Sequence, residues 1–287
     1  MSDMQQVLAR LEALLDRVEG LLPVPPAATD WSATAWRWQH NRGRGYLEAV
    51  THPHRIHLDD LKNVDEQKAE IVRNTEQFVQ GRPANNVLLT GARGTGKSSL
   101  VKALLSRFAE QGLRLVEVDK QDLLDLPQIT ALLRERPERF IVFSDDLSFE
   151  PGDPGYKALK VVLDGSVAAT SDNVLVYATS NRRHLMPEYM AENLETTHAG
   201  GEIRPGESVE EKVSLSDRFG LWLSFYAFNQ DEYLAVAAQW LRHYGIRELD
   251  EAARRAALQW ALTRGARSGR SAYQFARDYA GRIASDN

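Results

Sequence analysis

Short apolar runs alternate with longer segments of helical periodicity through the middle of the chain. The runs are predicted to be strands, at residues 86–90, 113–118, 140–143, 174–178 and 221–225. The segments before and between them have helical spacing and are predicted to be helices, at residues 58–80, 99–111, 123–136 and 154–169. Strands that are apolar along their whole length are typical of a parallel sheet covered on both faces. The pattern therefore predicts an α/β fold, a parallel sheet flanked by helices with right-handed crossovers.

The two ends of the chain follow other patterns. After residue 229 the sequence predicts three helices and no strand, at 231–244, 248–264 and 270–283. Near the start, residues 7–18 have the spacing of an amphipathic helix, and a proline-rich linker follows at 23–26. We therefore expect three parts: an N-terminal helix with a tryptophan-rich extension (1–48), an α/β domain (49–228) and a small all-helical domain (229–287).

Two segments have more than one interpretation. Trp31, Trp36 and Trp38 lie within eight residues. They could form an exposed docking patch for a partner, but we favour the interpretation that they pack the N-terminal segment onto the main domain. Residues 195–212 are rich in glycine, glutamate and threonine, and we expect a mobile loop or insertion there.

Composition excludes several classes of site and changes little else. The 287 residues carry a net charge of −5, so no global basic field attracts nucleic acid, although a local patch is not excluded. Cysteine is absent, which excludes disulfides and thiolate-zinc sites. No apolar run approaches the length of a transmembrane helix, and the first residues lack a signal-peptide pattern. We expect no membrane association and a cytoplasmic location.

Residues 91–98, Gly-Ala-Arg-Gly-Thr-Gly-Lys-Ser, match the G-x-x-x-x-G-K-[ST] phosphate-binding loop, or Walker A motif, between a predicted strand and a predicted helix. The glycines allow positive φ, and the loop N–H groups with the helix N-terminus can cradle phosphates. We expect Lys97 to bind the β- and γ-phosphates and Ser98 to ligate Mg²⁺. The predicted nucleotide-binding residues of the loop are Gly91, Ala92, Arg93, Gly94, Thr95, Gly96, Lys97, Ser98 and Ser99. The alternative is a glycine-rich hairpin turn that happens to carry a lysine.

A second element comes from the apolar run at 140–143, which leads directly into Ser144, Asp145 and Asp146. An acid delivered at the carboxyl end of such a strand can lie beside the loop serine and its metal, as in a Walker B motif. We expect Asp145 to be the Mg²⁺ partner and Asp146 to activate water. The alternative for both is a solvated acidic turn.

With these motifs the chain resembles the AAA+ ATPases over residues 55–287. The resemblance implies ATP and Mg²⁺ as cofactors, hydrolysis of ATP to ADP and phosphate, and a helical lid after the α/β core. It implies that Asn181 is the polar sensor and that Arg218 serves a neighbouring subunit's nucleotide as an arginine finger. It also implies that Arg270 acts from the lid, and that Ile56 and Leu58 lie near the adenine. Arg218 and Arg270 have an alternative interpretation as surface arginines.

The segments 85–91, 144–150 and 178–185 together resemble one bacterial family of predicted AAA+ ATPases of unknown function. Two features depart from common AAA+ patterns. Asp146 stands where a glutamate is usual, and its carboxylate reaches about 1.5 Å less far, which favours slow hydrolysis. Residues 119–139 contain no aromatic residue, and the aromatic-glycine pore loop of threading AAA+ rings is therefore absent there, which argues against a threading translocase.

The resemblance implies an oligomer, a ring or a filament, with the nucleotide at the subunit interface and an unidentified protein partner that ATP energy remodels. A slowly hydrolysing binding switch or adaptor is the first alternative, and a DNA-associated loader the second. Nucleic acid is not favoured, since the acids of residues 229–287 largely offset the arginines there. His52, His54 and His57 are taken as residues of an exposed linker rather than a metal cluster.

Overall fold

The computed structural model describes residues 28–41, 43–150, 153–164, 172–182, 185, 197–199, 202–204 and 215–285, with single residues at 5, 7, 10, 11 and 14. Two of the predicted features lie largely outside these described residues. Of the N-terminal helix only these single positions are described, all of them helical, and the proline-rich linker lies outside the described residues. Of the predicted loop at 195–212, only the short hairpin β7 (Thr197–Ala199) and β8 (Glu202–Arg204) is described.

The central element is a seven-stranded sheet in the order β2-β1-β4-β5-β6-β3-β9. Every neighbouring pair is parallel except β1 and β2, which form an antiparallel hairpin at one edge. The strand bounds are β1 Ala35–Asn41, β2 Arg44–Ala49, β3 Val87–Gly91, β4 Leu113–Glu117, β5 Arg139–Ser144, β6 Val174–Ser180 and β9 Leu221–Phe225. Each of the five predicted strands is therefore present, within two residues of its predicted ends.

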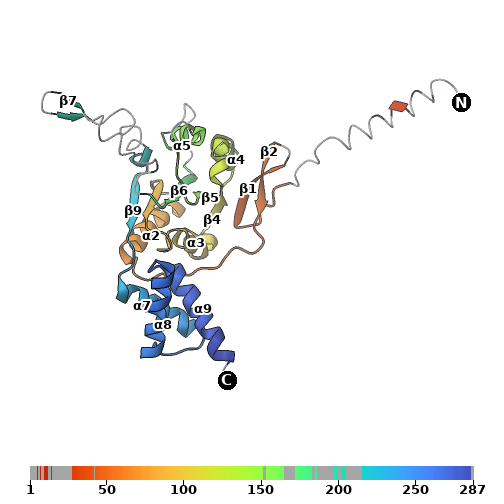
Figure 1. Ribbon diagram of the computed structural model, residues 1–287. Helices are drawn as coiled ribbons and strands as arrows, with labels where there is room; N and C mark the ends of the chain where they lie inside the picture. Colours follow the sequence, from red (N-terminus) through yellow and green to blue (C-terminus); the bar gives the residue numbers. More distant parts are fainter. Residues whose placement is uncertain are drawn as a thin grey trace.

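Helices cover both faces of the sheet, because its strands carry apolar side chains on both faces. Phe140 and Val142 face helices α4 (Leu126–Arg134) and α5 (Pro154–Asp164), while Ile141 faces the other side. That other side is covered by α2 (Asp65–Val79) and α3 (Lys97–Phe108). Figure 1 shows the two helical layers with the sheet between them. Among the described residues, no helix combines the length and apolar character that crossing a bilayer requires.

The hairpin β1–β2 brings the tryptophan-rich segment into the sheet. Trp36 and Trp38 are each 1% exposed and belong to the core beneath α4 and α5. Their indole N–H groups donate to the Asp30 carbonyl and to the Asp125 carboxylate. The packing interpretation is confirmed for these two rings, and a docking patch built on them is wrong. The domain boundary at residue 49 stays a prediction, although the sheet already begins at Ala35.

Two predicted helices are shorter than expected. The segment 58–80 is a 3₁₀ turn, Leu58–Asp60, followed by α2, since Asn63 adopts a left-handed φ of 61° that a continuous helix excludes. The segment 123–136 is a 3₁₀ turn, Lys120–Asp125, followed by α4, because Pro127 starts a helix more readily than it continues one. A third, the predicted helix at 154–169, is described to Asp164 as α5, and its last five positions lie outside the described residues.

The C-terminal part is a three-helix unit with a core of its own, made of α7 (Gln230–His243), α8 (Glu251–Arg264) and α9 (Gly269–Ser285). Asn229 caps α7 in a capping box with Glu232, and Asp250 caps α8. Figure 1 shows this unit beneath the sheet, at the end where the chain terminates. The predicted architecture is confirmed: a mostly parallel sheet flanked by helices, followed by a small all-helical unit, which we call the lid.

Candidate functional site

The loop between β3 and α3 has the backbone that its glycines predict. Gly91, Gly94 and Gly96 have φ of 123°, 73° and 99°, in the region that only glycine adopts without strain. At Gly91 a side chain is also excluded by space, because a Cβ atom would lie 1.9 Å from the Phe225 carbonyl oxygen on β9. Gly96 ends the loop and caps α3, so the N-terminus of that helix points back at the loop. Arg93 is exposed and Thr95 is buried, its hydroxyl bonded to the Ala92 carbonyl.

Lys97 is the buried cation of the site, only 5% exposed. Its ammonium donates to the carbonyls of Gly91 and Ala92, each at 2.8 Å, and to the Asn181 side-chain oxygen at 3.0 Å. Burial lowers its pKa, while the charges of Asp145 and Asp146 oppose that shift. A buried ammonium with only neutral acceptors bonded to it is a site that an anion would stabilise.

The carboxyl ends of three adjacent strands meet at this loop. Because β6 lies between β5 and β3, the residues after β5 and β6 approach the residues after β3. The Ser98 hydroxyl on α3 donates to the Asp145 carboxylate at 2.5 Å. The Asn181 side-chain amide donates to Asp146. Ser98, Asp145, Asp146 and Asn181 are therefore brought together, as the sequence predicted for each.

Thr179, near the end of β6, is a site residue that the sequence analysis missed. Its hydroxyl donates to the Asp145 carboxylate and accepts the Asp146 backbone N–H at 2.9 Å. The side chain is 1% exposed, so these bonds are sheltered from water. One hydroxyl thus fixes both acidic residues. The signal was the polar run Thr179-Ser180-Asn181 that interrupts an otherwise apolar strand.

Asp146 has an unusual backbone. Its φ is 52°, one of only two positive values for a residue other than glycine in the described part of the chain. Asp and Asn enter the left-handed region more readily than longer side chains, because their short polar group can bond locally. The backbone therefore gives an independent reason for an aspartate at this position.

The lid contacts the loop through the start of α9. The Gly269 N–H donates to the Gly94 carbonyl at 2.8 Å. A Cβ atom built on Gly94 would lie 2.9 Å from the Ser268 hydroxyl and 3.4 Å from the Arg270 Cβ. Arg270 therefore starts beside the phosphate-binding loop, and its role there stays a prediction.

Residues 56–63 join the loop to the lid. Leu58 packs against the core under α3, and the Leu61 side chain approaches Gly96. The Asp60 carbonyl accepts from the Gln239 side chain on α7 at 3.0 Å. These contacts put Leu58 near the site. Ile56 is half-buried just before this segment, and adenine contact stays a prediction for both residues.

Arg218 is the one predicted site residue that lies elsewhere. It precedes β9, whose first residue pairs with Val87 at the start of β3, while the loop begins at the other end of that strand. Its guanidinium bonds to the Asp164 carboxylate at the end of α5, at 2.5 Å. In a single chain, Arg218 therefore lies at the amino ends of the parallel strands, and the phosphate-binding loop lies at their carboxyl ends.

Residues 31–283 match the model of DUF815, a family described as proteins of unknown function. The chain belongs to this family. No curated protein matches this DUF815 chain.

Solved structures similar to the DUF815 chain include those of Thermotoga maritima RuvB, described as a Holliday junction branch migration motor. One has 16% identity and a TM-score of 0.47, covering 77% of this chain and 63% of that one. A point mutant of the same protein has 15% identity and a TM-score of 0.49 over the same shares. The DUF815 chain thus spans less than two thirds of the RuvB chains that it matches.

The residues of this DUF815 site suit magnesium bound together with a nucleotide. Ser98 and Asp145 supply oxygen donors, which Mg²⁺ prefers, and the glycine cradle with buried Lys97 suits phosphates. No group of three or more His, Asp or Glu side chains able to hold a metal occurs among the described residues. Mg²⁺ usually takes one or two carboxylates and completes its shell with phosphates and water, so two protein oxygens are enough.

Proposed function

We propose that this protein binds ATP with Mg²⁺ and hydrolyses it to ADP and phosphate. Lys97 and the loop N–H groups bind the phosphates, and Ser98 with Asp145 holds the metal. Asp146 activates water, and Asn181 positions that water or the γ-phosphate. Magnesium, when bound, neutralises charge on the phosphoryl oxygens. Thr179 is a positioning residue that fixes both aspartates.

The observation that carries this proposal is the bond between Ser98 and Asp145. The two residues come from different parts of the sequence, one after β3 and one after β5. Each was expected to bind the metal for its own reason, and their oxygens lie 2.5 Å apart. A glycine-rich hairpin turn or a solvated acidic turn would not require that meeting.

We further propose that the working form is an oligomer with ATP between two subunits. The support is the position of Arg218, which can reach a nucleotide only if that nucleotide belongs to another copy. A guanidinium there would spread its charge over the phosphoryl oxygens in the transition state. Repetition of one such contact produces a ring if it closes and a filament if it does not. Arg270 would complete the site from the lid of the same chain. The proposed location is the cytoplasm.

The test is phosphate release by the wild type and by Lys97→Ala, with Lys102→Ala as the matched control. Lys102 lies on the same helix, is about one third exposed, and pairs with Glu117 at 3.8 Å. We expect Lys97→Ala to lose at least 10²-fold in rate, and the control to keep it, because only Lys97 faces the phosphates. Equal rates in the wild type and Lys97→Ala would refute the enzyme proposal.

A second candidate function is a nucleotide-dependent switch or adaptor that hydrolyses ATP slowly. It is favoured by the short side chain of Asp146, its left-handed backbone and its bond to Asn181. In this case the output of ATP binding is a changed surface, and the Gly269–Gly94 bond gives the lid a direct link to the loop. The partner would be a protein not yet identified, and the buried Trp36 and Trp38 would not form the surface that binds it.

A further inference from the structure

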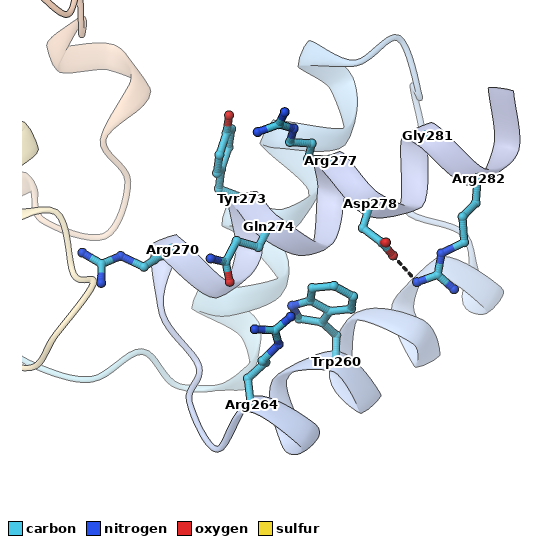
Figure 2. A pocket seen from close by; sticks show the side chains of 9 residues that line it. All are labelled: Trp260, Arg264, Arg270, Tyr273, Gln274, Arg277, Asp278, Gly281 and Arg282. Atoms are coloured by element: carbon cyan, nitrogen blue, oxygen red, sulfur yellow. Dashed lines mark hydrogen bonds and ion pairs between the residues drawn. The ribbon is translucent and has the colours of Figure 1, made fainter. Parts of the chain in front are cut away.

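A groove lies on the lid between α8 and α9, with a volume of about 980 Å³. We call it the lid groove and define it by six side chains: Trp260, Arg264, Arg270, Tyr273, Arg277 and Arg282. Figure 2 shows Arg264 beside the Trp260 ring on α8, and Arg277 next to Tyr273 on α9. The sequence presents these arginines as scattered among acids, but the fold collects four of them in one place.

The charges of the lid are separated in space. Its acids stand mainly at helix starts, where Asp231 and Glu232 lie in the first turn of α7 and Asp250 with Glu251 begins α8. The lid groove contains one acid, Asp278, which pairs with Arg282. In the described part of the chain, Arg264, Arg270 and Arg277 form no ion pair with a carboxylate. A chain with a net charge of −5 therefore carries a local cationic surface that its own acids do not neutralise.

Flat side chains accompany these cations. The Arg264 guanidinium lies over the Trp260 ring, 4.9 Å from its centroid. Tyr273 packs edge-on against Trp240 at 4.9 Å, which holds its ring in place. Stacked guanidinium groups and aromatic rings are the surfaces on which unpaired bases stack.

Gly281 leaves one end of the lid groove without a side chain. It lies inside α9, where glycine costs about 0.5–1 kcal/mol relative to alanine. A Cβ atom built there would meet no atom of the described residues within 4 Å, so packing against those residues does not demand glycine. Glycine at such a place lets another molecule come close to the helix backbone.

We propose that the lid groove binds single-stranded nucleic acid. Arg277 on α9 would contact a phosphate of the strand, while Arg270, which starts beside the phosphate-binding loop, is kept for the nucleotide. The groove is a surface feature rather than an enclosed cavity, which suits a chain that enters and leaves better than a small ligand. Unpaired bases would stack on Trp260 and Arg264. The proposal does not rest on ATP hydrolysis, and it is tested without nucleotide.

The experiment measures fluorescence anisotropy of a labelled thymidine oligonucleotide of about 20 nucleotides at low salt. The variants are Arg277→Ala and Gly281→Glu, and the control is Arg255→Ala, an exposed arginine of α8 outside the groove. We expect each groove variant to weaken binding about tenfold and the control to change it less than about twofold. Arg277→Ala should also lower the slope of log K against log [salt] by about 0.7. The same sequence as a duplex should bind about tenfold more weakly than the single strand, because its bases cannot stack on the groove.

Three results would overturn the proposal. One is an absence of oligonucleotide binding by the folded wild type at low salt. Another is equal weakening by Arg255→Ala and by the groove variants, which would mean diffuse attraction. The third is competition by polyglutamate as strong as that by the oligonucleotide, which would assign the lid groove to an acidic protein segment. Circular dichroism melts of every variant ensure that the comparison is made between folded proteins.

Discussion

The carboxyl edge of the sheet and the start of β9 hold the proposed catalytic groups in different ways. At the carboxyl edge, hydrogen bonds link Lys97 to Asn181, Asn181 to Asp146, and Ser98 to Asp145. At the start of β9, Arg218 is bonded to the Asp164 carboxylate at the end of α5. About 13 Å of strand, from Leu221 to Phe225, separates the two regions.

This difference between the two regions shows which groups of the proposed ATP site a single chain brings together. The binding groups are assembled by strand order within a chain, so they are in place before any partner arrives. Under the oligomer proposal, Arg218 acts on the nucleotide of a second copy of the chain. If this comparison is right, ATP binding should be a property of the monomer and rapid hydrolysis a property of the assembly.

The largest expected effect on the rate of phosphate release comes from replacing Arg218 at the start of β9. Arg218→Ala should lower phosphate release by about 10³-fold, because the transition-state charge loses its guanidinium. Lys97→Ala should be inactive for the opposite reason, since its own site cannot hold phosphate. Mixing the two inactive variants should restore activity, because an intact site of one variant can meet the intact Arg218 of the other. Phosphate release by the separate and mixed proteins measures this.

Arg218→Lys is the control, since it keeps the charge but lacks the planar fork of arginine, and it should retain part of the rate. A mixture as inactive as its components would mean that Arg218 does not act between subunits. Light scattering with a slowly hydrolysed ATP analogue shows whether each variant still assembles.

An intermediate effect on the rate of phosphate release is expected from removing the hydrogen bonds that Thr179 forms at the carboxyl ends of the strands. Thr179→Val removes the hydroxyl that bonds both Asp145 and the Asp146 N–H while keeping the shape of the side chain. We expect phosphate release to fall by about 10²-fold, the usual cost of moving a reacting group by about 1 Å. Thr179→Ser keeps the hydroxyl and should stay within a few-fold of the wild type. A Thr179→Val protein with normal turnover would show that Thr179 has only a structural role.

The sequence predicted those parts of the fold whose signals are local. The strands β3, β5, β6 and β9 are nearly continuous apolar runs, and the loop glycines sit where positive φ is needed. The edge hairpin was missed, although Trp36 and Trp38 alternate with Arg37 and Gln39 at the spacing of a strand. Its place beside β4 depends on pairing between residues about 80 positions apart, which a local pattern does not encode.

The site divides in the same way. The positions of Lys97, Ser98 and Asp145 were predictable because each lies where a recognisable strand ends or a helix begins, and Asn181 was expected from the family resemblance. Their roles stay predictions. Their meeting depends on the order of β5, β6 and β3 in the sheet, which no single segment specifies. Thr179 was missed because a threonine in an apolar strand is usually structural. The convergence of arginines in the lid groove was missed because it depends on how α8 and α9 pack.

The smallest effect should come from Asp146→Glu, which tests whether Asp146 limits the proposed site to slow turnover. The added methylene extends the carboxylate by about 1.5 Å, which would bring it closer to the attacking water. The cost is a longer side chain on a backbone with φ of 52°, a strain of about 1 kcal/mol. Since that strain is smaller than the gain from correct placement, we expect phosphate release to rise roughly tenfold. Asp146→Asn, which keeps the size and loses the charge, should abolish turnover. A fall in rate with Asp146→Glu would mean that the backbone, rather than reach, requires aspartate, and brisk wild-type turnover with no gain would favour the ATP-driven remodelling function over the switch.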